Sequence, residues 1–308
     1  MTQSGSPTNE VAKSDDDRIL DAYGVPDPSF AFILGGFRRI SVNPKDARAR
    51  KMLLKKGLKY FSRVQSFIFS SMNELPVDLF LDVGSNYGEC AFSVPLYSST
   101  RVVGFEANQA LHEHLQRSRA YNDDVSNIEF VHAAVSSKAG EVLTFYIDNA
   151  WSGKSSVVHD KKKKNQTKVE VRATSVDQEL KRIGGSPNLL LLKVDVEGYE
   201  PAVFEGARHT IASVPNIVCL MEFDSKYLAI GGTDPAAFFS RLSADFEIFQ
   251  LEDSMRQVTS YAELGDEEGG VIHTNLVLSR CRHDSVATRF RERIVQQNLK
   301  QAAGKAWR

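Results

Sequence analysis

A turn bracketed by two glycines follows an apolar stretch in FLDVGSNYGE, residues 80–89. Gly84 and Gly88 can adopt positive φ and let a ligand approach the backbone, and the helix expected after them offers free N–H groups. The spacing differs from the G-x-G-x-x-G pattern that binds a dinucleotide pyrophosphate. Asp82 would repel a pyrophosphate but suits an amino group. The pattern favours S-adenosylmethionine, an adenosine that ends in an amino acid, over an ordinary strand–turn–helix.

Two further residues end the next predicted strands. Glu106 closes VVGFE, 22 residues after Gly84, where an acid can accept hydrogen bonds from both ribose hydroxyls. Alone, such an acid is more often solvated, so this assignment depends on the preceding turn. His132 could contact adenine or accept a proton, and a histidine with neither role is an equal alternative.

A charged cluster follows the apolar run at 189–192. Lys193, Asp195, Glu197 and Glu200 fall within eight residues. Strand alternation sends the first three to one side, and ligands bind at strand ends in α/β sheets. Charges beside a buried strand are costly unless they are paired or functional. The cluster therefore predicts either a catalytic site or a set of ion pairs that only stabilises the sheet edge.

Together these stretches resemble FkbM-type S-adenosylmethionine-dependent methyltransferases. The family pattern D-x-G-x-N-x-G is matched by Asp82, Gly84, Asn86 and Gly88. The later pattern K-x-D-x-E-G-x-E is matched by LKVDVEGYE at 192–200. The resemblance covers roughly residues 78–250. At 174–177 the chain reads T-S-V-D and departs slightly from the T-L-D of the family.

The resemblance implies a class I, Rossmann-like α/β fold with a mostly parallel seven-stranded sheet whose last strand is antiparallel. It implies O-methylation of a hydroxyl on a sugar, a glycosylated metabolite or a related natural product. Asp82 would face the methionine amino group, Glu106 the ribose diol, and the segment His132 to Ala134 the adenine. The residues expected at the methionine and ribose are those of the turn: Gly84, Ser85, Asn86 and Gly88.

Methyl transfer to an alcohol requires alignment of the acceptor oxygen and removal of its proton. The candidate bases are Asp195 and Glu197, and Glu222 on a later strand could join them. Three carboxylates could also hold Mg²⁺, which prefers oxygen ligands. We rank the metal below direct base catalysis because no His or Asn spacing supports it, and we predict no metal ligands.

Two other classes of function compete with this prediction. The chain could be a non-catalytic scaffold that keeps the cofactor fold and docks to an anionic partner, although the near-complete motifs argue against lost function. A nicotinamide-dependent dehydrogenase is the less favoured alternative because the glycine spacing is wrong.

Alternation of short apolar strands with helices predicts a doubly wound sheet. Residues 141–172 interrupt that rhythm, and we expect an inserted pair of strands on the acceptor side. The strands expected in the sheet are 78–83, 101–106, 127–131, 188–195, 216–222, 246–250 and 271–279. The helices expected are 44–72, 88–97, 108–121, 175–183, 199–213 and 234–242.

The formal net charge of the 308 residues is −1, although a segment near each end of the chain is strongly basic. Residues 38–63 hold ten basic side chains and one acid, and residues 280–308 hold eight and two. The helix at 44–72, with Asn43 as N-cap, would carry the first set and could meet an anionic acceptor, partner or membrane surface. The predicted regions are a disordered leader (1–17), a basic helical extension (18–75), the methyltransferase domain (76–280) and a basic tail (281–308).

The composition restricts the class of protein, its cellular compartment and its partners. The chain is 42% hydrophobic and 25% charged, which excludes a disordered or fibrous protein. Three cysteines without a C-x-x-C pair argue against a disulfide framework or a zinc site. We find no signal peptide and no transmembrane stretch, so we expect a cytoplasmic protein. We expect a small-molecule or glycan acceptor and no specific nucleic-acid binding; the sequence leaves the oligomeric state open.

Overall fold

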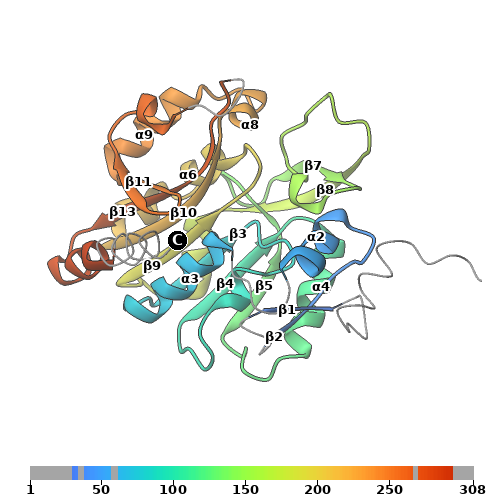
Figure 1. The fold of residues 1–308 in the computed structure, drawn as a ribbon, viewed down its shortest axis with the longest axis horizontal. Helices are drawn as coiled ribbons and strands as arrows, with labels where there is room; N and C mark the ends of the chain where they lie inside the picture. Colours follow the sequence, from blue (N-terminus) through green and yellow to red (C-terminus); the bar gives the residue numbers. More distant parts are fainter. Residues whose placement is uncertain (1–29, 34–37, 57–61, 266–269, 294–308) are drawn as a thin grey trace, which may run out of the picture.

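The computed structural model describes residues 30–33, 38–56, 62–265 and 270–293. Its centre is an eight-stranded sheet in the order β12-β11-β13-β10-β9-β3-β4-β5 (Figure 1). The strands are β3 (Leu79–Val83), β4 (Arg101–Glu106), β5 (Ile128–His132), β9 (Leu189–Val194), β10 (Asn216–Asp224), β11 (Glu247–Leu251), β12 (Met255–Val258) and β13 (His273–Cys281).

The pairing confirms the predicted fold class. Strands β5, β4, β3, β9 and β10 run parallel, and β13 runs antiparallel between β10 and β11. The seven predicted strands are all present. The eighth strand, β12, pairs antiparallel with β11 at the sheet edge. It is four residues long with two exposed polar side chains at its centre, so the sequence gives little strand signal there.

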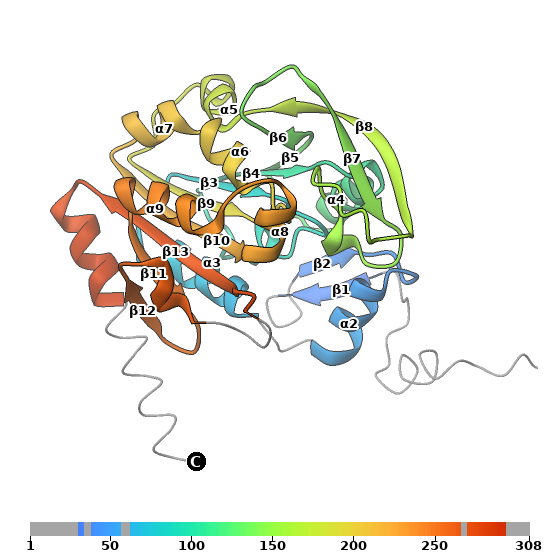
Figure 2. The ribbon, with the colours of Figure 1, turned by 90° about the horizontal axis from the view of Figure 1, so that it is seen from above.

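Each face of the sheet is covered by helices, because successive side chains of a strand point to opposite faces. One core contains Phe80 and Leu191, and the other contains Leu79 and Leu81. The first is covered by α3 (Arg63–Glu74), α4 (Gln109–Ala120) and the helical residues 284–293. The second is covered by α5 (Val176–Ile183), α6 (Glu200–Glu205), α7 (Arg208–Ser213), α8 (Ser225–Ile230) and α9 (Pro235–Asp245) (Figure 2).

The insertion forms a small separate sheet. β7 (Val142–Asp148) pairs antiparallel with β8 (Gln166–Thr174), and β8 also pairs with β6 (Ala134–Val135). Between β7 and β8 lies the 3₁₀ helix η3 (Ser152–Lys154). The two inserted strands were predicted, and Figure 1 shows them next to α2 (Ala47–Lys56).

The N-terminal segment differs from the prediction of one helix over 44–72. The described residues form two helices, α2 and α3, preceded by the antiparallel strands β1 (Phe30–Ile33) and β2 (Arg38–Ser41). Ser62 and Gln65 form a reciprocal capping box that starts α3 anew. The predicted N-cap is also wrong, because the Asn43 Oδ1 accepts from the Lys45 amide while Asp46 Oδ1 accepts from the Arg48 amide at the helix start.

Two other predicted helices need correction. The helix expected at 88–97 is a series of turns with only a 3₁₀ helix, η2 (Ala91–Ser93). The helix expected at 199–213 is divided into α6 and α7 at Gly206, where a Cβ atom would lie 2.0 Å from the Ser136 carbonyl oxygen. Helix α8 was not predicted.

The predicted leader at 1–17 lies outside the described residues. Among the residues described, no helix combines the length and apolarity needed to cross a membrane.

Candidate active site

The glycine turn after β3 adopts the backbone conformation that its sequence favours. Gly84 has φ +80°, Asn86 φ +51° and Gly88 φ +84°. A Cβ atom on Gly84 would lie 1.9 Å from the carbonyl oxygen of Asp195. The missing side chain therefore lets the ends of β3 and β9 approach each other, which is a packing reason that the sequence pattern did not indicate.

Glu106 holds this turn from the neighbouring strand. Its Oε2 accepts a hydrogen bond from the Asn86 amide and its Oε1 from the Asn108 amide, each at 2.8 Å. Burial raises the pKa of Glu106 to about 7, against the lowering effect of these two amides. Each carboxylate oxygen has a second lone pair, so Glu106 can still accept from ligand hydroxyls.

Asp82 is fully buried next to Lys193. Its Oδ2 accepts from the Ala91 amide at 3.2 Å. Its Oδ1 has no hydrogen-bond partner among the described residues and lies 3.5 Å from Lys193 Nζ. Burial raises the pKa of Asp82, and Lys193 opposes that effect. Lys193 Nζ also donates to the Gly84 carbonyl at 2.7 Å and pairs with Asp195 Oδ2 at 3.3 Å. Lys193 thus links the first motif to the second.

The remaining predicted cofactor residues separate into two groups. Ser85 and Ala134 line the same cavity as Gly84 and Glu106, and the Ser85 hydroxyl donates to the Asp82 carbonyl at 2.9 Å. His132 is exposed, with Nε2 3.0 Å from the Ala107 carbonyl oxygen. It is not among the residues that line the cavity, whereas its successors Ala133 and Ala134 are.

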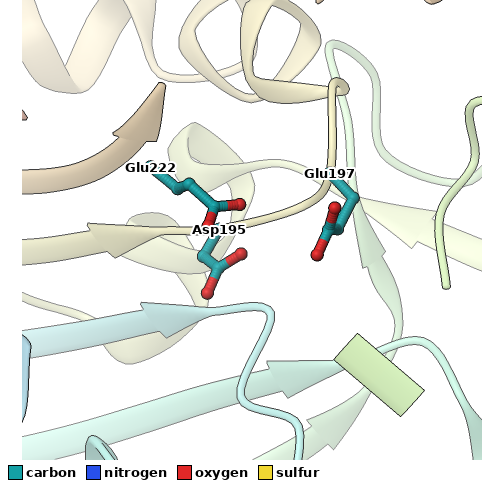
Figure 3. Close-up of side chains that lie close together, drawn as sticks. All are labelled: Asp195, Glu197 and Glu222. Atoms are coloured by element: carbon teal, nitrogen blue, oxygen red, sulfur yellow. The ribbon is translucent and has the colours of Figure 1, made fainter. Parts of the chain in front are cut away.

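The three predicted catalytic acids converge. Figure 3 shows the carboxylates of Asp195, Glu197 and Glu222 close together. One carboxylate oxygen from each lies within 4.8 Å of the others. Glu197 has φ +56°, a strained conformation of the kind found at functional sites. Burial raises the pKa of Glu197, with Glu222 and Asp195 adding to the effect. Burial and then Asp195 raise the pKa of Glu222.

Glu200, the fourth acid of the sequence cluster, has a different place. It is buried, and its Oε1 accepts from the amides of Val196 and Gly198 at 3.1 and 3.3 Å. Burial raises its pKa to about 8. Glu200 therefore supports the loop that carries Glu197 and does not line the cavity.

A cavity of about 590 Å³ connects these groups. It is lined by Gly84, Ser85 and Asn86 of the glycine turn, by Glu106, the three acids and Lys193, and by side chains that the sequence did not single out as site residues. Two residues that the sequence assigned to the cofactor, Asp82 and Gly88, do not line it. His273 on β13 lies 3.0 Å from Glu222 Oε1, because β13 pairs with β10. The other lining residues that were missed include Arg48, Lys51, Lys154, Tyr199 and Tyr227.

Helix α2 joins the site through its first turn. Arg48 Nη1 lies 2.7 Å from Glu89 Oε1 and donates to Asn86 Oδ1 at 3.1 Å. Asp46 accepts from the Tyr87 hydroxyl at 2.8 Å. The amide of Ser152 donates to the same carboxylate at 3.2 Å. The basic segment, the glycine turn and the insertion thus form one hydrogen-bonded wall.

The cavity fits S-adenosylmethionine in the chemistry of its donors and acceptors. Glu106 and the amide-lined turn suit the ribose and the backbone-facing part of the ligand. The partly exposed Asp195, which lines the cavity, offers negative charge to an ammonium group, whereas Asp82 is fully buried behind the wall beside Lys193. The three acids have the oxygen donors of a Mg²⁺ site, but Lys193 and His273 already pair with two of them.

This strand order, with the antiparallel β13 inserted beside β10, is the fold of class I methyltransferases. The family model Methyltransferase FkbM domain matches residues 82–248, more than half of the chain. The chain therefore belongs to the FkbM methyltransferase domain family.

Individual relatives were also found. The chain is 30% identical over 161 residues to Methyltransferase sdnD of Sordaria araneosa, a match spanning 43% of this chain and 61% of that protein. The tRNA (uracil-54, C5)-methyltransferase of Pyrococcus abyssi, in complex with S-adenosyl-L-homocysteine, shows 12% identity, a TM-score of 0.40, and coverage of 82% of this chain and 44% of that one. An O-methyltransferase from Bacillus cereus shows 11% identity, a TM-score of 0.40, and coverage of 88% and 93%.

Proposed function

We propose that the protein transfers a methyl group from S-adenosylmethionine to a hydroxyl of a sugar, a glycosylated metabolite or a related natural product. The observation that carries the proposal is the convergence of Asp195, Glu197 and Glu222 in the cavity that also contains Glu106 and the glycine turn. When bound, the cofactor supplies an electrophilic methyl group on a sulfonium.

The cofactor side of the cavity is the part formed by β3 and β4. Glu106 accepts from the ribose hydroxyls, and Asn86 is held in place by both Glu106 and Arg48. Asp195, which lines the cavity, faces the amino group, and the buried Asp82 acts through Lys193, which it helps to hold in place beside Asp195. Ala134, on β6, forms part of the apolar wall on the adenine side.

The acid cluster receives the proton of the acceptor hydroxyl. Glu197 and Glu222 have raised pKa values, so the cluster holds a proton near neutral pH and loses it as the pH rises. The cluster must lose its own proton before it can accept the proton of the hydroxyl. Turnover should therefore increase with pH as the pH rises above neutrality. His273 beside Glu222 orients that carboxylate.

The first test is direct binding and transfer. Calorimetry with S-adenosylhomocysteine should show binding to the full chain, and labelled methyl groups should pass into a component of a fractionated cell extract. Absence of cofactor binding contradicts the proposal. Binding without transfer to any fraction would favour a scaffold, and a fluorescence change with NADPH would favour a dehydrogenase.

The second test concerns the base. Glu197→Gln should retain S-adenosylhomocysteine binding and lower turnover about 10²- to 10⁴-fold, the usual contribution of a positioned general base. Glu205→Gln is the matched control, because Glu205 is exposed on α6 outside the cavity. Equal turnover in wild type and Glu197→Gln would exclude Glu197 from the proton transfer.

A further inference from the structure

Two lysines from separate elements each contact the indole ring of Trp151 in the cavity. Lys51 Nζ on α2 lies 5.3 Å from the ring centroid of Trp151, and Lys154 Nζ on η3 lies 5.7 Å from it. All three residues line the cavity. Ammonium groups at these distances are attracted by the face of a tryptophan ring.

Lys51 of α2 and Lys154 of η3 differ from Arg38 and Arg48 of the N-terminal segment. Arg38 pairs with Asp124 and Arg48 pairs with Glu89, each through a short ion pair. Among the described residues, no carboxylate oxygen lies within 4.0 Å of the ammonium of Lys51 or Lys154. An aromatic ring replaces only part of the hydration of an ammonium group, so both lysines retain donors for an anion.

The part of the insertion that carries Trp151 is fixed against α2. The Ala47 amide donates to the Ala150 carbonyl at 3.2 Å, and Gly153 packs so closely that a Cβ atom there would lie 2.9 Å from Arg48 Cδ. On the other side, Lys163 Nζ donates to the Lys154 carbonyl at 2.9 Å while lying over the Tyr227 ring. The insertion and α2 thus present both lysines to the cavity from a fixed backbone.

The charges in the cavity are separated by element. Acidic side chains lie at or just after the ends of β4, β9 and β10 in Glu106, Asp195 and Glu222, and a further acid, Glu89, is paired with Arg48. The unpaired positive charges lie on α2 and η3. A neutral acceptor would gain nothing from this separation, whereas an anionic one would be oriented by it.

We propose that the acceptor carries an anionic group, a phosphate or a carboxylate, which binds Lys51 and Lys154 beside Trp151. The anion accepts hydrogen bonds from the two ammonium groups that the indole ring positions. This orientation points the rest of the acceptor toward the acid cluster. Because the proposal names the class of acceptor, it rests on the proposed methyl transfer. Binding of an anion at Lys51 and Lys154 can nevertheless be measured separately.

The experiment uses the full chain with Trp307→Phe, which leaves Trp151 as the single tryptophan. The protein is saturated with S-adenosylhomocysteine and titrated, at constant ionic strength, with glucose 6-phosphate, glucuronate or glucose while tryptophan fluorescence is recorded. We expect a saturable change with glucose 6-phosphate, glucuronate or both, and none with glucose. The first two probes distinguish a phosphate from a carboxylate.

Lys51→Met with Lys154→Met should weaken anion binding about tenfold or more, because two charge-assisted contacts are lost. Lys161→Met with Lys162→Met is the matched control: both are exposed lysines of the same insertion and do not line the cavity. No saturable response to either anion, an equal response to glucose, or equal loss in the control pair overturns the inference.

Failure of the inference and failure of the proposed function give different results. If S-adenosylhomocysteine binds and methyl transfer occurs but neither anion binds, only the anionic acceptor is wrong. If the anions bind through Lys51 and Lys154 but S-adenosylhomocysteine does not bind by calorimetry, the methyltransferase proposal fails while the anion site remains. Circular dichroism of each variant establishes that it is folded.

Discussion

Glu106 is the residue whose ionisation should couple most directly to the cofactor. Burial raises its pKa to about 7 in the free protein. Ribose hydroxyls that donate to the carboxylate stabilise its charged form, so binding lowers this pKa and releases a proton. The affinity for S-adenosylhomocysteine should therefore increase about tenfold between pH 6 and pH 8 and level off above that range.

Calorimetry in two buffers of different ionisation enthalpy measures the released proton. At pH 6.5 we expect a fraction of a proton released per cofactor bound. Glu106→Gln should bind more weakly and show no such release, because a glutamine does not titrate. Proton uptake by the wild type, or an affinity independent of pH, would contradict the role of Glu106.

The acid cluster makes a second prediction at this scale. Lys193 lies 3.3 Å from Asp195 and His273 lies 3.0 Å from Glu222, so two of the three acids already have cationic or donor partners. Turnover should therefore be unchanged after treatment with EDTA and dialysis. Loss of activity that added Mg²⁺ restores would show that the cluster binds a metal and would replace direct base catalysis.

The predictability of these residues depends on whether a general rule of the fold brings them together, and not on their separation along the chain. Asp82, Glu106 and Asp195 could be found because strand ends of a parallel sheet meet at one edge. Lys51 and Trp151 are a hundred residues apart, and nothing local in either segment indicates that they meet. His273 was missed for the same reason: its contact with Glu222 arises only when β13 pairs with β10.

At the scale of elements, Gly84 is where β3 and β9 meet. A side chain there would meet the Asp195 carbonyl at 1.9 Å in a backbone with φ +80°. Gly84→Ala should lower the free energy of unfolding by about 3 kcal/mol or more through strain and overlap, and should abolish cofactor binding. Urea unfolding and calorimetry measure the two effects.

Gly140 supplies the matched control, because its φ is +86° and no atom lies within 4 Å of an added Cβ. Gly140→Ala should cost only about 1 kcal/mol, the strain of a left-handed alanine. Equal destabilisation by the two substitutions would mean that the contact with β9 contributes nothing beyond the conformational cost.

Element boundaries were less predictable than element types. Hydrophobic spacing correctly predicted seven strands and most of the helices, since buried faces impose a period on the sequence. It joined α2 to α3 and α6 to α7, because apolar spacing continues across both junctions. Only local hydrogen bonds distinguish them, such as the Ser62–Gln65 capping box and the amide of Asp177 donating to the Gly206 carbonyl.

At the scale of the whole molecule, the basic segments at the two ends contribute to the fold. Arg38 is buried and donates to the Phe92 and Val94 carbonyls as well as to Asp124. Arg293 is buried against α3, where it donates to the Phe67 carbonyl and pairs with Glu74. Arg38 and Arg293 of the two basic segments therefore join elements of the fold, whereas Lys51 and Lys154 line the cavity.

The helical residues 284–293 complete the core on the face that α3 covers. Phe290 is 1% exposed and packs edge-on against Phe249 of β11, with ring centroids 5.7 Å apart. Phe290→Ala should lower the free energy of unfolding by about 3–5 kcal/mol, the usual cost of a cavity of this size. The cofactor affinity of the folded protein should not change, because neither aromatic residue lines the cavity.

Arg289→Ala, at the neighbouring exposed position, should change stability by less than about 0.5 kcal/mol. Urea unfolding of both variants, with calorimetry at low urea, separates the core from the site. A small effect of Phe290→Ala would mean that the C-terminal helix is an appendage and not part of the core. Weakened cofactor binding in the folded variant would mean that this packing is coupled to the cavity across the sheet.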